Sequence, residues 1–125
     1  MKELKEAIVH SDRFDIDIKR FLTYAQIQKI IETTMPLKTW ALRKTNIDLM
    51  VLCYATNMDN DEIQKIGIDK FVESGLMEEV CYTVENYDSI NDGLIYHESI
   101  AKALFELSEK LPEIKETLNK ELIKK

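Results

Sequence analysis

The alternation of apolar and polar residues divides the chain into one strand-like segment and several helix-like segments. Near the N-terminus, Phe14, Ile16 and Ile18 alternate with charged residues, which is the period of a β-strand. Residues 1–10, which precede this strand, fit a short helix or a mobile arm. Because a lone strand is unstable and no second strand is evident, we expect residues 1–20 to form an extended arm whose edge seeks a partner.

The best-defined helix start in the sequence is at Thr23. Residues 23–26 read Thr-Tyr-Ala-Gln, the S/T-x-x-E/Q pattern of a capping box. Leu22 and Ile27 occupy the two positions of a hydrophobic staple around this cap. Pro36 disfavours a helical conformation at the residue before it, so the predicted helix ends at Met35.

Residues 37–55 carry apolar side chains on more than one face, which is typical of a central helix. A buried strand at residues 49–54 is the alternative, because short apolar runs are ambiguous. Asn46 and Asp48 interrupt the strand-like alternation and favour the helix. We expect most of the aromatic side chains, Trp40 among them, to belong to the core of the fold.

The second half of the chain predicts shorter helices separated by glycines. Asp59 and Glu62 suit the start of a helix that ends at Gly67. Gly75 ends a further short segment, and apolar residues at helical spacing follow it over residues 76–84.

The C-terminal residues predict a separate surface helix that begins near Pro112. Proline suits the first position of a helix, where its missing N–H group has no partner in any case. Within residues 111–125, Ile114, Leu118 and Leu122 are four apart and form one narrow apolar stripe among Lys and Glu residues. Such a stripe fits either docking into a groove of another protein or packing against the same chain.

Composition agrees with a helical fold. The chain has 125 residues, of which 45% are hydrophobic, 32% are charged, and only three are Gly and two Pro. Folds with many tight turns need more of these two residues. We therefore expect a single domain, residues 1–125, of the all-α class: a compact multi-helix domain with an extended N-terminal arm and a C-terminal amphipathic helix.

Charge and hydropathy restrict the partners. A formal net charge of −6 opposes broad contact with nucleic acid, and the basic patches at Arg43-Lys44 and Lys124-Lys125 are small. No apolar run approaches the roughly 20 residues of a membrane span, and no signal peptide is evident. We expect an intracellular location, without membrane contact.

The sequence offers no recognisable catalytic, cofactor or metal site. Cys53 and Cys81 lie among apolar residues and fit buried thiols better than a disulfide or a reactive thiol. His10 and His97 have no second ligand at a spacing typical of metal sites. His97 and Ser99 are close in sequence, but near neighbours in a helix point in different directions. We expect a protein that is not an enzyme.

The order of these segments resembles a family. An arm that ends in Phe21-Leu22, a capped helix over residues 23–31, an apolar helix over 47–56 and the segments 71–76 and 87–99 follow one another. This order is similar to that of small helical virion and assembly proteins of tailed phages that infect Gram-positive bacteria. The resemblance covers residues 14–104 and implies a structural or assembly role, such as a minor virion component, an adaptor or a chaperone. It also implies a location in the host cytoplasm or in the virion.

The predicted function is therefore protein binding, with other virion proteins or a second copy of the chain as partners. The alternative is a small acidic inhibitor or regulator that binds a host protein, and an enzyme with a site built from scattered polar residues is a further rival. The residues predicted to make the contacts are those of the arm and of the C-terminal stripe: Phe14, Ile16, Ile18, Ile114, Leu118 and Leu122.

Overall fold

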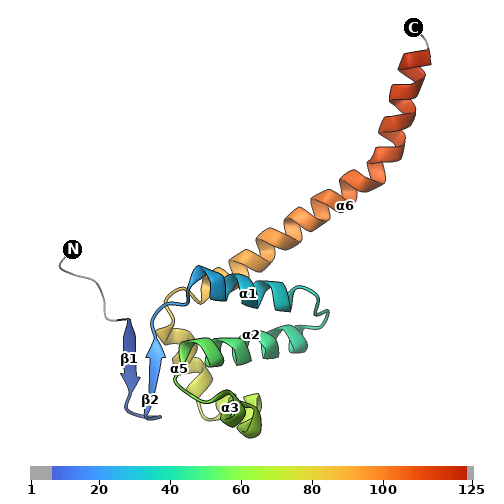
Figure 1. Cartoon of the computed structure of the whole chain (residues 1–125). Coiled ribbons are helices and arrows are strands. Elements are labelled where there is room, and N and C mark those ends of the chain that lie inside the picture. Colours follow the sequence, from blue (N-terminus) through green and yellow to red (C-terminus); the bar gives the residue numbers. More distant parts are fainter. Residues whose placement is uncertain (1–6, 124–125) are drawn as a thin grey trace, which may run out of the picture. The chain divides into compact units, whose positions relative to one another are not determined.

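The computed structural model describes residues 7–123, except for the side chains of residues 114, 118 and 121–123. Within this range the chain forms a two-stranded sheet and six helices (Figure 1). It divides into two compact units, Met1–Gly93 and Leu94–Lys125. The elements in chain order are β1 (Ile8–Ser11), β2 (Ile16–Lys19), α1 (Tyr24–Thr34), α2 (Trp40–Ala55), α3 (Asn60–Ile66), α4 (Ile68–Glu73), α5 (Leu76–Thr83) and α6 (Asp88–Ile123).

Residues 8–19 form a β-hairpin and not an extended arm, so the all-α prediction is correct only as a mostly helical fold. Residues 1–6 of the predicted arm lie outside the described residues. β1 pairs with β2 in antiparallel register, from Ile8 opposite Lys19 to Ser11 opposite Ile16. The turn between them ends at Asp15, which has a φ of 53°, a conformation that Asp tolerates better than most residues. β1 is only four residues long, and its sequence shows little of the apolar–polar alternation that is typical of a strand.

β2 connects the hairpin to the helices. Its last apolar residue, Ile18, is 1% exposed and belongs to the core. On its free edge, Ile18 forms an isolated bridge with Thr56, the residue that follows α2. The N–H group of Asn57 donates to the carbonyl of Asp17 at 3.3 Å, and the N–H group of Asp17 donates to Asn57 Oδ1 at 3.0 Å. The end of α2 therefore covers the second edge of β2.

α1 begins and ends as its sequence predicts. Thr23 accepts from the N–H group of Gln26, and Gln26 accepts in return from the N–H group of Thr23, which completes the capping box. The two residues of the staple, Leu22 and Ile27, are both buried. The helix ends at Met35, before Pro36.

α2 runs beside α1 as the second arm of a helical hairpin (Figure 1). Asn46 donates to the hydroxyls of Thr33 and Thr34 at 3.0 and 2.8 Å, so the two helices share polar contacts in an otherwise apolar interface. The prediction of a helix here is confirmed, but Trp40 lies at its first position and is 78% exposed.

The short helices that follow also agree with the sequence. Asp59 caps α3, and Gly67 ends it with a φ of 87°. Gly75, with a φ of 85°, separates α4 from α5. Positive φ is strained for residues with a Cβ atom, which explains why glycine stands at both boundaries.

The core of the first unit lies between β2, α1, α2 and the short helices. α5 and the first turns of α6 contribute to it as well, and Gly93 of α6 comes so close to Ile31 that a Cβ atom would lie 2.2 Å from its Cδ1 atom. The buried apolar residues of this unit are Ile18, Leu22, Ile27, Ile30, Ile31, Val51, Leu52, Ala55, Ile63, Phe71, Leu76, Met77, Val80, Val84 and Ile90.

Two chain segments that are 64 residues apart in sequence close the first unit. The side chain of Asn86 accepts from the N–H group of Leu22 at 2.9 Å and donates to the Leu22 carbonyl at 2.8 Å. The N–H group of Glu85 donates to the Arg20 carbonyl at 2.6 Å. These three bonds, which we call the Asn86 clasp, fix the α5–α6 junction beside the start of α1.

The second unit consists of the remainder of α6, as far as the structure describes it. The predicted helix start at Pro112 is wrong, because α6 continues through this residue as one helix (Figure 1). Proline inside a helix removes one backbone hydrogen bond. The residues on either side of Pro112 are mostly Leu, Glu and Lys, which have high helix propensity and maintain the helix.

We expect Thr23→Ala to lower the free energy of unfolding by about 1 kcal/mol, because the cap of α1 loses its acceptor. Urea denaturation followed by circular dichroism measures this change. Thr23→Ser keeps the hydroxyl and serves as the control. An unchanged urea midpoint in Thr23→Ala would show that the capping box contributes no stability.

Candidate functional site

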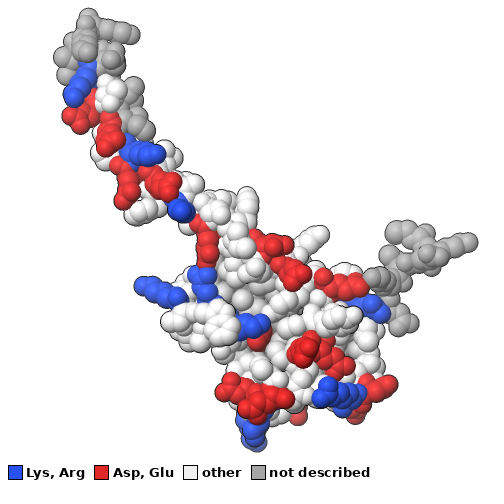
Figure 2. Space-filling view, turned by 180° about the vertical axis from the view of Figure 1, so that it is seen from behind, with Lys and Arg blue, Asp and Glu red and all other residues white. Residues whose placement is uncertain are grey.

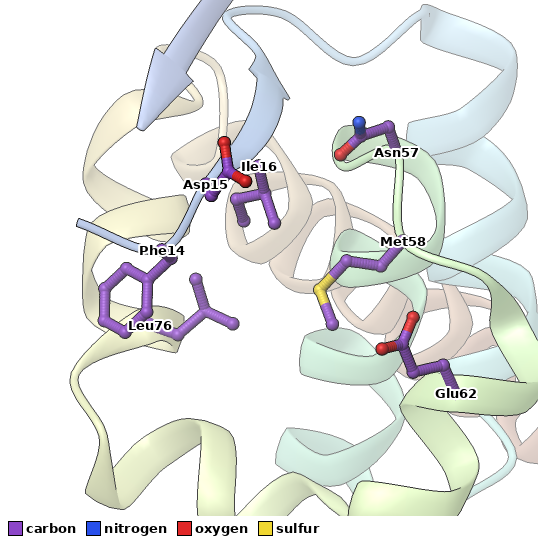
Figure 3. Close-up of a pocket in the computed structure, with 7 residues that line it drawn as sticks. All are labelled: Phe14, Asp15, Ile16, Asn57, Met58, Glu62 and Leu76. Atoms are coloured by element: carbon purple, nitrogen blue, oxygen red, sulfur yellow. The ribbon is translucent and has the colours of Figure 1, made fainter. Parts of the chain in front are cut away.

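The hairpin, the start of α3 and the start of α5 surround a groove of about 370 Å³. Figure 3 shows Phe14, Ile16 and Leu76 on one side of it and Met58 on the other. Phe14 and Ile16, two residues predicted to contact a partner, thus line one surface. The residues that line the groove are Phe14, Asp15, Ile16, Asn57, Met58, Glu62 and Leu76.

The groove combines an apolar floor with carboxylates at its rim. Leu76 is buried, and Phe14, Ile16 and Met58 are half-buried. Asp15 and Glu62 are exposed. Asn57 already binds the backbone of Asp17, so its side chain holds the hairpin in place. The groove is open and offers contact area.

The other predicted contact residues do not join this groove. Ile18, the third residue of the predicted arm, is buried in the core and has no surface to offer a partner. Ile114, Leu118 and Leu122 belong to α6 by their backbone, but their side chains lie outside the described part of the structure.

His10 is held by three aspartates of the hairpin. Its Nδ1 atom lies 2.8 Å from Asp17, its directly opposite neighbour on β2, and its Nε2 atom lies 3.2 Å from Asp15 and 3.9 Å from Asp12. The hydrogen bond to Asp17 is the main cause of a raised His10 pKa, and the charges of the three carboxylates add to it. His10 therefore links the two strands across the turn.

A polar network connects α2 to the α5–α6 junction. Asp48 is 3% exposed and accepts from Lys44 Nζ at 3.1 Å and from the hydroxyl of Tyr87 at 3.3 Å. Lys44 also donates to the Tyr87 oxygen at 3.0 Å. Lys44 and Asp48 are four residues apart and so lie on one face of α2, but nothing in the local sequence indicates that Tyr87 completes the network.

The surroundings of Lys44 and Tyr87 keep the lysine charged and the tyrosine neutral. Burial disfavours the ammonium of Lys44, but its hydrogen bonds to Tyr87 and Asp48 outweigh burial and raise the Lys44 pKa. Burial raises the pKa of Tyr87 to about 12. At neutral pH the lysine is therefore protonated and the tyrosine neutral, so neither is a general base.

Burial accounts for the state of the two thiols, and His97 and Ser99 contact residues close to them in the chain. Cys53 and Cys81 are free, and burial raises the pKa of each thiol, which lowers its reactivity. Ser99 donates to the Ile95 carbonyl at 2.8 Å, and the His97 ring packs edge-on against Tyr96. Within residues 7–123, no group of three or more His, Cys, Asp and Glu side chains is arranged to hold a metal ion.

The small basic patch at Arg43-Lys44 is engaged within the first unit. Arg43 donates to the carbonyls of Leu37 and Met35 at 2.7 and 3.2 Å and so holds the loop between α1 and α2. Lys44 belongs to the network with Asp48. No helix of the described chain is both long and apolar enough to cross a membrane.

An apolar surface that was not predicted from the sequence lies on α6 before Pro112. Seven large side chains of this segment are exposed. The sequence indicates this surface through apolar residues at intervals of three and four, such as Leu104, Leu107 and Leu111. The exposed residues are Ile95, Tyr96, Ile100, Leu104, Phe105, Leu107 and Leu111.

Comparisons with protein-family models, with curated proteins and with solved structures give no match to this chain.

We expect Asp48→Ala to lower the free energy of unfolding by about 2–4 kcal/mol, because the substitution leaves Lys44 and Tyr87 without their shared buried acceptor. Urea denaturation measures the loss. Asp92→Ala removes an exposed carboxylate and should change stability by less than about 0.5 kcal/mol. Equal effects of the two substitutions would contradict a structural role for the network.

We expect the His10 pKa to fall toward its ordinary value, about 6.5, in Asp17→Asn, because the main cause of its elevation is removed. A group with a raised folded-state pKa stabilises the fold fully below its unfolded pKa, and this stabilisation is lost as pH rises through the folded-state pKa. NMR titration of the His10 ring measures the shift. Asp12→Asn, at the longest of the three distances, is the control and should lower the pKa less.

Proposed function

We propose that this chain is a non-enzymatic structural or assembly protein that acts by binding other proteins, as a virion component, an adaptor or an assembly chaperone of a tailed phage. The observation that supports the proposal most strongly is the exposed apolar surface of α6. Monomeric proteins rarely expose extended apolar patches, and large exposed patches are typical of surfaces that bind other proteins.

The distribution of the exposed residues supports protein contact in particular. Leu104 and Phe105 are 61% and 64% exposed, and Ile100, Leu107 and Leu111 are each at least 40% exposed. Exposed Glu and Lys side chains, such as Lys102 and Glu109, separate them along the helix. An amphipathic helix of this kind suits a helix-in-groove or helix–helix interface.

The titratable groups of the first unit support a non-enzymatic role. Lys44, Asp48 and Tyr87 satisfy one another, and the Cys53 and Cys81 thiols have raised pKa values. His10 is paired with aspartates at the surface of the hairpin. The lysine, the aspartate, the tyrosine and the histidine each have a structural partner, whereas a catalytic site requires groups aimed at a substrate.

The charge distribution gives no support to an acidic regulator that mimics nucleic acid. Figure 2 shows Asp and Glu side chains interleaved with Lys and Arg on the face in view. The formal net charge of −6 is the balance of 23 acidic and 17 basic residues. Mimicry of a phosphate backbone requires a more continuous acidic surface.

We expect the full chain, produced together with phage capsid and tail proteins, to be captured with one or more of them. The double variant Leu104→Lys/Leu107→Lys should lose this capture, because two charges then interrupt the apolar surface. Affinity purification with quantitative mass spectrometry measures the loss.

The matched control is Ser99→Lys/Asn119→Lys, which adds the same charge to α6 outside the apolar spacing and should bind like the parent. Capture of no virion protein by the parent would overturn the assembly role. Equal capture by both double variants would show that α6 is not the contact.

A further inference from the structure

We propose that the apolar stripe of α6 pairs with the same stripe of a second copy of this chain, in an antiparallel coiled coil. The proposal rests on the proposed function and deepens it by naming one protein partner. It follows from the spacing of the apolar residues, from the size of the residues beside them and from the placement of two lysines.

The spacing is that of a heptad repeat. Ile100, Leu104, Leu107 and Leu111 follow one another at intervals of four, three and four residues and are 40%, 61%, 51% and 43% exposed. The sequence continues the intervals of three and four with Ile114 and Leu118. Residues at these intervals occupy the a and d positions of a coiled coil and form one narrow seam. We call the four described residues the α6 seam.

The residues beside the seam are small or polar. Ala101 and Ser108 occupy e positions, Ala103 occupies a g position, and all three are exposed. A helix that covers a broad core needs further apolar residues at these positions, whereas a seam between two helices does not. Small flanking side chains also allow a second helix to approach closely.

The α6 seam is self-complementary. In an antiparallel pair, a residues of one helix face d residues of the other, so Leu104 lies opposite Leu107 of the second copy and Ile100 lies opposite Leu111. The same four side chains thus build four apolar layers by symmetry. Two-fold symmetric dimers use such self-complementary surfaces.

Two lysines determine the orientation. Lys110 occupies a g position and Lys115 the e position five residues later. In a parallel pair these positions face each other across the interface, so Lys110 would meet Lys115 of the second copy at both flanks. Like charges across a coiled coil oppose pairing. In the antiparallel pair, g faces g, and Lys110 lies beside Ala103 of the second copy.

Pro112 is compatible with this arrangement. It follows Leu111 directly and therefore occupies a b position, on the side of the helix away from the α6 seam. The four described layers lie before it in the chain.

Sedimentation equilibrium of the full chain over a range of concentrations tests the pairing. We expect a monomer–dimer equilibrium for the parent and for Ser99→Lys/Asn119→Lys. Leu104→Lys/Leu107→Lys should raise the dissociation constant at least tenfold with an unchanged circular dichroism spectrum. A parent that is monomeric at every concentration, or a lysine variant that dimerises like the parent, would overturn the proposal.

Cysteine cross-linking tests the pairing and its orientation without relying on the lysine variant. In a Cys53→Ser/Cys81→Ala background, a chain with Ile100→Cys mixed with a chain with Leu111→Cys should form a mixed disulfide. Ile100→Cys alone should not cross-link, because the two copies of this residue would lie about 16 Å apart, at 1.5 Å per residue, beyond the reach of a disulfide. Rapid cross-linking of Ile100→Cys alone would overturn the antiparallel orientation.

The outcomes separate this proposal from the proposed function. A monomeric parent that still loses its virion partners on Leu104→Lys/Leu107→Lys overturns the self-pairing but leaves the assembly role intact. A dimer that captures no virion protein supports the self-pairing and overturns the assembly role. A monomeric parent that captures no virion protein overturns both.

Discussion

The Asn86 clasp is the interaction on which the rest of the structure depends. A single side chain satisfies both backbone groups of Leu22, and the adjacent Glu85 bonds to the Arg20 carbonyl. Because these contacts join residues 64 positions apart, they fix the start of α6 beside the start of α1. Ile90 then enters the core, and Gly93 packs closely against Ile31. Beyond Gly93, the remainder of α6 forms a unit of its own, in which large apolar side chains such as Leu104 and Phe105 are exposed.

The same junction also positions the buried polar network. Tyr87 directly follows Asn86, and its hydroxyl reaches the buried carboxylate of Asp48 beside Lys44. Burying a carboxylate is costly unless it is paired and hydrogen-bonded, and here it is both. The network therefore holds α2 to the α5–α6 junction from the inside, while the clasp holds the junction from the side of α1.

Features that depend on a few neighbouring residues were predictable from the sequence. Thr23 with Gln26, Gly67 and Gly75 determine the ends of helices through local hydrogen bonds or backbone conformation, and the structure places all of these ends as predicted. The helix start predicted at Pro112 is wrong, although it also rested on a local rule. The preference of proline for the first turn of a helix is outweighed here by the helix-forming residues on either side.

Features that depend on contacts between distant residues were not predictable. The partner of β2 is only four residues long, so its pairing depends on the turn and on cross-strand contacts such as His10 with Asp17. Phe14 and Ile16 were expected at a partner surface, but whether they line a groove depends on Met58 and Leu76, which lie far along the chain. Lys44 and Asp48 are recognisable as a helical pair, whereas Tyr87 joins them only through the tertiary fold.

The central claim is that the α6 seam is covered by another copy of the chain. Hydrogen–deuterium exchange of the amides of residues 100–111, measured at several protein concentrations, tests it most directly. Pairing predicts that exchange slows as concentration rises, while the amides of α1 and α2 exchange at constant rates. Exchange of residues 100–111 that is independent of concentration, and as fast as in Leu104→Lys/Leu107→Lys, would contradict the account.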